Sequence, residues 1–278
     1  MYSVKRTIIL AILACCTNVQ AEGYVLGLGS DGDSADGRSI SAFGDFGIRE
    51  NTWLSVTANS SRTEGFLRSN DTILADVGID HWFEPVGVRV GGSYWGNSDI
   101  LDSKDLRASV YARGKVGSIS LDYQKRNFKF DLQSVLLRGG TVEFSADGVG
   151  FSTRLTLGEK LSFHFGGMSY DYSRNLRLQP DIDVLAFVAT SRLSMVNSLI
   201  ENRINAGLEY KFGLRSIDVT AGRWQTVVDG SEVDSFSVGF LTPVSDRVDM
   251  EFRISLDDSE AFGKTTSFSF YVYYFGGS

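Results

Sequence analysis

Few residues of this sequence are suited to acid–base chemistry or metal binding. The chain has only two histidines, His81 and His164, and a hydrolytic site would need one of them beside a nucleophile. Each stands close to a short predicted turn, away from the longer loops, so we expect no enzyme activity. Residues 31–37 carry oxygen ligands in a spacing that resembles a calcium loop, but the third aspartate comes one position late and the distal glutamate is missing. We therefore expect a solvated hairpin loop there, with no metal and no cofactor.

The charged residues are more informative, because they alternate with apolar ones. Over residues 247–257 every second residue is apolar and the residues between them are charged or polar. A period of two predicts a strand. The same alternation occurs over residues 105–116 and 203–212. Over residues 141–157 it continues only with a slip at positions 147–148, which predicts a β-bulge. A second bulge is expected at Gly222, because Arg223 would otherwise join the apolar face.

An apolar face that alternates with a charged face suits strands with lipid on one side and water on the other. We therefore assign the charged faces to the inside of a barrel. The candidate lumen-lining residues are Arg89, Arg107, Arg113, Lys115, Asp122, Glu143, Arg154, Arg203, Glu209, Lys211, Asp218, Asp249, Glu251 and Arg253. Two interpretations remain open: the charges line a water-filled passage, since a wide barrel need not be filled by side chains, or they interlock as salt bridges and close it. We favour the passage.

Turn signals divide the chain into strands of similar length. Short turns near residues 49–51, 84–85, 116–117, 158–160, 213–215 and 245–246 alternate with longer polar segments. Alternation of short turns and longer loops is the rule in membrane barrels. The sequence predicts an all-β fold, a single antiparallel up-and-down transmembrane β-barrel of about fourteen strands, with 12–16 possible. Residues 181–200 have apolar residues near helical spacing; they are expected to form a short helix that plugs the mouth or, alternatively, an extra hairpin that would give sixteen strands.

Aromatic residues gather close to the predicted strand ends. Amphipathic rings favour the headgroup level of a membrane, so we interpret these residues as interfacial anchors. The candidate membrane-interface aromatics are Trp53, Trp82, Phe83, Trp95, Trp224 and Phe275.

The N-terminus has the pattern of a secretory signal peptide. Lys5 and Arg6 precede an apolar stretch over residues 7–16, and Val19-Gln20-Ala21 then offers small residues at the positions that a signal peptidase prefers. This predicts a signal peptide over residues 1–21 and a barrel domain over residues 22–278; the alternative is a lipoprotein signal with lipid on Cys15. The formal net charge of −7 argues against nucleic-acid binding.

The last predicted strand, residues 266–275, ends in Tyr274 and Phe275. It resembles the C-terminal signal of Gram-negative outer-membrane β-barrels, although residues 276–278 follow it here. In size and strand count the chain is similar to OmpG-type monomeric porins and to FadL-type transporters, but it has no room for the N-terminal plug of the latter.

The resemblance implies a monomer in the cell outer membrane, in contact with lipid and lipopolysaccharide and folded by the barrel assembly machinery. It also implies a channel for passive diffusion of small hydrophilic solutes. The alternatives are a non-conducting structural or surface-interaction barrel and a soluble secreted β protein.

Overall fold

The computed structural model describes residues 23–64, 69–97, 101–131, 140–176, 199–260 and 263–277. The expected signal peptide lies outside the described residues. The described chain forms fourteen strands: β1 Tyr24–Asp33, β2 Arg38–Arg49, β3 Thr52–Glu64, β4 Ser69–Trp82, β5 Val86–Asn97, β6 Leu101–Gly114, β7 Gly117–Asp131, β8 Thr141–Leu157, β9 Leu161–Tyr172, β10 Ile200–Phe212, β11 Arg215–Thr226, β12 Glu232–Ser245, β13 Val248–Ser259 and β14 Gly263–Gly276.

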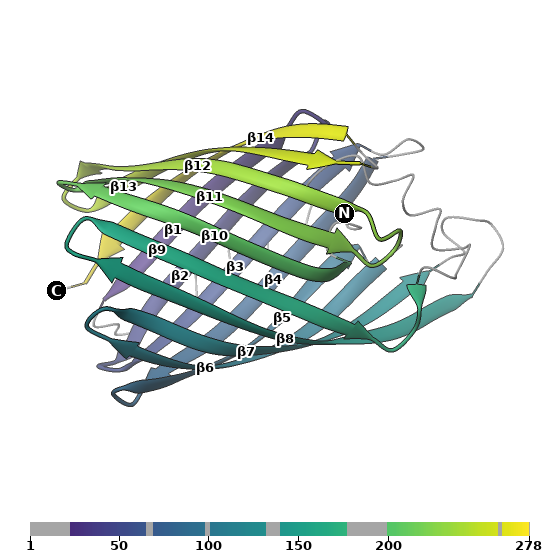
Figure 1. Cartoon of the computed structure of the whole chain (residues 1–278), viewed down its shortest axis with the longest axis horizontal. Helices are drawn as coiled ribbons and strands as arrows, with labels where there is room; N and C mark the ends of the chain where they lie inside the picture. Colours follow the sequence, from purple (N-terminus) through teal and green to yellow (C-terminus); the bar gives the residue numbers. More distant parts are fainter. Residues whose placement is uncertain are drawn as a thin grey trace.

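The strands form one closed barrel (Figure 1). Each strand pairs in antiparallel fashion with its neighbours in the chain, and β1 pairs with β14 to complete the ring. The expected all-β up-and-down barrel of about fourteen strands is confirmed. Because β9 pairs directly with β10, the ring does not have sixteen strands. The expected helix over residues 181–200 falls mainly on residues 177–198, outside the described part of the chain. In the described ranges, no helix is long and apolar enough to span a membrane.

The two faces of the barrel wall differ in polarity. Paired residues share a face, so Val238, Ile254 and Phe268 lie side by side on the outer surface. Large apolar side chains of this kind stay exposed all around the outer wall, and Phe268 is 60% exposed. An apolar surface that encircles the protein would be unstable in water and is stable in lipid. The apolar band therefore fixes which faces of the strands point outward.

The six short turns lie together at one end of the barrel, on the left in Figure 1, where β14 also ends. They match the short turns expected from the sequence. At the other end the strands continue farther than expected, because several polar segments interpreted as loops remain paired. The β7–β8 hairpin is the longest, with strands of 15 and 17 residues.

At the end away from the short turns, the β7–β8 hairpin carries charged residues on its outer face and apolar residues on its inner face, the reverse of the rest of the wall. Lys125 pairs with Asp147 and Lys129 pairs with Glu143 on the outer face, whereas the inner face carries aromatic rings. A charged outer face indicates that this part of the hairpin has left the lipid. The β7–β8 register has no shift, so the expected bulge at positions 147–148 was wrong. The apparent slip in the sequence reflects a change of surroundings along an unbroken strand.

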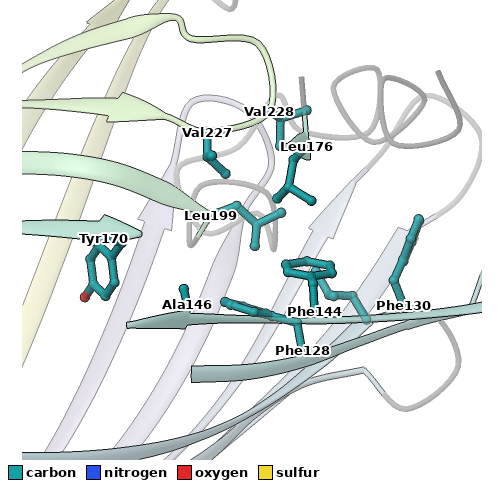
Figure 2. Packing of buried hydrophobic residues seen from close by; sticks show 10 residues of the cluster. Phe128, Phe130, Phe144, Ala146, Tyr170, Leu176, Leu199, Val227 and Val228 are labelled. Atoms are coloured by element: carbon teal, nitrogen blue, oxygen red, sulfur yellow. The ribbon is translucent and has the colours of Figure 1, made fainter. Parts of the chain in front are cut away.

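An apolar cluster, called here the rim cluster, lies inside this end of the barrel (Figure 2). Its buried members are Leu101, Phe128, Phe130, Phe144, Ala146, Tyr170, Leu176, Leu199, Val227 and Val228. The rings of Phe128 and Phe144 stack with their centroids 4.8 Å apart. Arg126 lies 4.7 Å from the centre of the Phe128 ring and donates a hydrogen bond of 3.1 Å to Asp105. The rim cluster thus packs on one side of the barrel mouth.

The second expected bulge, at Gly222, was also wrong. The β11 register with both neighbours continues through Gly222, so Arg223 lies on the outer face. Its guanidinium donates to Asp234 at 2.7 Å and lies 3.1 Å from Glu232. These three charged side chains mark the place where β11 and β12 leave the apolar band.

Candidate functional site

The inner wall encloses a cavity of about 690 Å³. Side chains from nine strands, β1–β7, β9 and β10, contribute to its lining. They include Asp45 on β2, Asp80 on β4, Arg107 on β6 and Arg203 on β10. A cavity that is bordered by so many strands and by several charged side chains belongs to the lumen and not to a groove between two neighbours.

Most charges of the lumen are paired along the wall. Arg89 donates to Asp80 at 2.7 Å and Arg107 donates to Asp76 at 2.9 Å. The other inner-face pairs identified between described residues are Arg126–Asp105, Arg154–Glu209, Lys211–Glu209, Arg253–Asp218 and Arg253–Glu251. Each pair joins residues on the same strand, on adjacent strands or on strands two apart. Pairs of this reach cannot cross a fourteen-strand barrel, so none of them bridges opposite walls.

Large inner side chains lie flat over glycines of a nearby strand. Tyr111 covers Gly87, and a Cβ atom at Gly87 would overlap the tyrosine ring. The same arrangement recurs for Phe43 over Gly27, Tyr271 over Gly29, Tyr170 over Gly148 and His164 over Gly207. Glycine in a strand permits such close approach. The rings therefore rest against the wall and do not project toward the axis.

The strand register places most of the predicted lumen residues on the inner face. These are Arg89, Arg107, Arg113, Asp122, Arg154, Arg203, Glu209, Lys211, Asp218, Asp249, Glu251 and Arg253. That they line an open passage stays a prediction. Glu143 was assigned wrongly, because β8 has no bulge and carries Glu143 on the outer face opposite Lys129. Lys115 lies in the β6–β7 turn and not in a strand.

Several inner-face charges were missing from the predicted set, among them Asp105 and Arg126. Asp105 and Arg126 both lie on the inner face, where they form a buried pair. Counting by twos from Arg107 and Asp122, which were assigned inward, would have found both.

The predicted interface aromatics need correction. Trp53, Trp82, Trp95, Trp224 and Phe275 all lie on the inner face by register. Being close to a strand end does not decide the face, which depends on odd or even position in the strand. Trp82 stacks on Tyr111 at 5.6 Å between ring centres, and Trp53 borders the cavity. Phe83 lies in the β4–β5 turn and is 64% exposed.

Other aromatic residues occupy the outer face at the short-turn end. Tyr24 and Tyr274 lie 6.2 Å apart across the β1–β14 pair. Phe212 lies 6.3 Å from Tyr210 and 6.4 Å from Phe240. These outward rings hold the position that an interfacial girdle requires.

The two histidines each contact a threonine. His81 Nδ1 lies 2.7 Å from the Thr52 hydroxyl on the outer face, and His164 Nε2 lies 3.2 Å from the Thr220 hydroxyl on the inner face. At the opposite end, Asp33 accepts hydrogen bonds from the Ala35 and Gly37 amides, so it shapes the β1–β2 hairpin. Among the residues that the structure describes, no group of His, Cys, Asp and Glu is arranged to hold a metal ion.

No protein-family profile matches the chain, and no curated protein matches it in sequence. Among solved structures, it is similar to the CymD monoaromatic hydrocarbon channel, with a TM-score of 0.60 and 11% identity over 93% of this chain and 89% of that one. Weaker likenesses include a loop-deletion mutant of OmpT, an outer membrane protein of Vibrio cholerae (TM-score 0.49, 8% identity, 92% and 100% covered). Another is the NanC porin (TM-score 0.48, 10% identity, 90% and 98% covered). At these identities the first likeness shows the fold alone, a closed barrel of the kind found in outer-membrane channels.

Proposed function

We propose that this barrel is a porin-like channel through which small hydrophilic solutes diffuse passively. The observation that carries the proposal is the arrangement of the inner charges around the cavity. They pair along the wall, within two strands of each other, and no identified pair between described residues joins opposite walls. A lumen that is charged on all sides must be hydrated, because burying such charges without water would be very costly.

The glycine-seated side chains support the same proposal. Tyr111 and Tyr271 would narrow the lumen if their rings pointed toward the axis. Instead, each lies over a glycine and donates a hydrogen bond along the wall, Tyr111 to Asp80 at 2.5 Å and Tyr271 to Asp31 at 2.8 Å. Both rings thus lie along the wall and leave more room in the lumen, which supports passive diffusion.

The surroundings proposed for the channel follow from its outer face. We place it in the outer membrane, as a monomer whose apolar band contacts lipid and whose long-loop end faces lipopolysaccharide outside. Its short-turn end would face the periplasm, after removal of residues 1–21 and folding by the barrel assembly machinery.

A second candidate function is a non-conducting structural or surface-interaction barrel. The rim cluster favours it, because buried rings from β7, β8 and β9 fill one side of the mouth. The two functions differ in whether the remaining part of the mouth admits ions and solutes.

Planar-bilayer recording of the purified, folded protein tests the proposal. We expect discrete conductance steps, with weak preference between small cations and anions because the wall carries both signs. Folding would be checked by the shift in gel migration between unheated and heated samples. A correctly folded barrel that gives no steps would reject the channel and favour the non-conducting function.

A further inference from the structure

The inner charges are sorted into two opposing halves of the barrel. On β5–β10 the inner face carries seven bases, Arg89, Arg107, Arg113, Arg126, Arg154, Arg203 and Lys211, and three acids, Asp105, Asp122 and Glu209. On β11–β14 and β1–β4 it carries mainly acids, including Asp31, Asp45, Asp218, Asp249, Glu251 and Asp257. The described base in that half, Arg253, is bound to Asp218 and Glu251. A solute in the lumen therefore has an excess of positive charge on one side and an excess of negative charge on the other.

Three charges that border the cavity, Arg203, Asp45 and Asp122, have no identified ion-pair partner among the described residues. Arg203 on β10 is exposed to the lumen, and its charge acts on Tyr170 without a hydrogen bond. Asp45 on β2 is half-buried and is influenced by Arg89, whose own hydrogen bonds go to Asp80. Asp122 on β7 accepts a hydrogen bond of 3.0 Å from the Ser120 hydroxyl and lies in the same half of the barrel as Arg203. Arg203 and Asp45 are therefore the two unpaired charges of opposite sign that lie in different halves.

Arg203 and Asp45 lie on nearly opposite sides of the barrel. In the ring of strands, β11–β14 and β1 separate them on one side, and β3–β9 separate them on the other. Figure 1 shows β10 in the front wall and β2 in the back wall. Both border the same cavity of about 690 Å³, which is within the size range of small-molecule sites, about 300–1,000 Å³.

We propose that the lumen holds a binding site for small zwitterionic solutes, with the solute carboxylate at Arg203 and its ammonium group at Asp45. This inference rests on the proposed channel and names its solute class. A guanidinium can hold a carboxylate through two parallel hydrogen bonds, and a carboxylate accepts from an ammonium group. A solute with a single charge pairs with only one of the two residues and leaves the other residue without a charged partner.

Binding to the folded barrel in detergent tests the site by isothermal titration. The probes are 4-aminobutyrate, 6-aminohexanoate and 8-aminooctanoate, which carry the same two charges at increasing separation. Hexanoate and hexylammonium are the singly charged matches. We expect at least one zwitterion to bind about tenfold more tightly than either match, because a charge-assisted hydrogen bond contributes at least that factor.

Four variants assign the two ends. Arg203→Gln and Asp45→Asn should each remove the preference for the zwitterion, a loss of about tenfold, whereas Arg203→Lys should retain most of it because the charge remains. Arg113→Gln and Asp249→Asn are the matched controls, since both residues lie on the inner face without bordering the cavity. If Arg203→Gln fails to fold, Arg203→Lys and Asp45→Asn still decide the question.

The site is overturned if no zwitterion binds more tightly than its singly charged matches, or if the control variants lose binding as much as the cavity variants. Conductance recorded on the same preparation separates the two proposals. Conductance without zwitterion binding keeps the channel and rejects the site. Zwitterion binding without conductance keeps the site and rejects the channel.

Discussion

Single glycines decide how far the inner side chains reach into the lumen. The Tyr111 ring lies over Gly87 on the next strand, and its hydroxyl reaches across β5 to Asp80. Phe43 and Tyr271 lie over glycines of β1 in the same way. A methyl group at any of these glycines would have to displace a ring that already holds its place by packing or hydrogen bonding.

Gly87→Ala should therefore lower conductance. The new Cβ would push the Tyr111 ring away from Asp80 and toward the axis, and the crowding should cost about 1–3 kcal/mol in stability. Gly92→Ala on the same strand is the control, because it points outward and its Cβ would meet ordinary contacts, 3.5 Å from the Asp105 carbonyl and 3.7 Å from Leu106. Single-channel conductance and urea unfolding measure both effects. Equal conductance in the two variants would show that the position of the Tyr111 ring does not limit the width of the lumen.

The protonation of Asp229 should make the stability of the β11–β12 turn depend on pH. Burial acts to raise the pKa of Asp229, but hydrogen bonds from Thr226 and Ser231 outweigh it and hold that pKa below its usual range. The pKa of Asp229 is lower in the folded protein than in the unfolded chain. The hydrogen bonds to Asp229 therefore stabilise the turn fully when the pH is above the unfolded pKa, and that stabilisation is lost as the pH falls through the folded pKa. Hydrogen exchange at the Ser231 amide should accelerate, relative to the intrinsic rate, in acid below about pH 4. The Asp229→Asn variant should show no such step, and a step that persists in it would assign the effect to another group.

At the scale of strands, the order of elements could be predicted from the sequence but some faces could not. Alternation and turn residues are local signals, and they located all six short turns. The face of Glu143 was wrong because polarity inverts where the β7–β8 hairpin leaves the lipid, and the position of the membrane surface is not a local property. The faces of Trp53 and Trp224 were wrong because closeness to a strand end says nothing about odd or even position. The ion pairs of Arg107 and Arg253 cross an intervening strand, which only the closed ring reveals.

The assigned faces of β10 predict opposite outcomes for two arginine substitutions. Leu208 is 48% exposed on the outer face, and Asn205 points into the lumen. Leu208→Arg should cost about 2–4 kcal/mol in a bilayer, because it places a charge close to the middle of the apolar band. Asn205→Arg, in a wet lumen, should cost far less. Urea unfolding in lipid vesicles compares the two, and equal losses would contradict the assigned faces.

The edge of the apolar band on β12 can be located by chemical labelling. Asp234 and Val238 share the outer face, but Asp234 binds Arg223 where the strand has left the lipid. In a background with Cys15 and Cys16 replaced by serine, we expect Asp234→Cys in vesicles to react readily with a membrane-impermeant maleimide. Val238→Cys should stay protected until detergent is added. Rapid labelling at both positions would mean that the band ends farther down the strand.

At the scale of the whole molecule, the barrel is uneven around its axis. The two longest strands, β7 and β8, and the rim cluster lie on the side of β6–β11, where most of the inner arginines also lie. The ring is nevertheless continuous, because β1 pairs with β14 over the whole length of β1. The closure gives the protein no free sheet edge among its described strands.

A disulfide across the closing pair tests this ring. Val25 and Phe275 are direct partners. The Phe275 amide donates to Arg247 at 2.9 Å on the far side, so Val25 and Phe275 form a non-hydrogen-bonded pair with closely spaced Cα atoms. In the cysteine-free background, Val25→Cys with Phe275→Cys should oxidise to a bond in the folded protein and not in urea. The control pair, Val25→Cys with Ser255→Cys, should stay reduced. Failure of the first pair to form in folded protein would show that the ring is open there.

The pairing of β1 with β14 also has a consequence in time. Of the fourteen strands, β1 is synthesised first and β14 last, so the two strands that close the wall are the first and the last to emerge from the ribosome. Until β14 is available, every partial sheet has two edge strands with unpaired backbone groups, which can pair with other chains. Pairs between consecutive strands are local in the sequence and form quickly. The β1–β14 pair instead joins residues more than 200 positions apart, as in the hydrogen bond from Tyr271 to Asp31. Export and assembly factors must therefore protect the incomplete chain from aggregation until β14 is available. A truncated chain that lacks β14 would form a sheet that cannot close into a barrel.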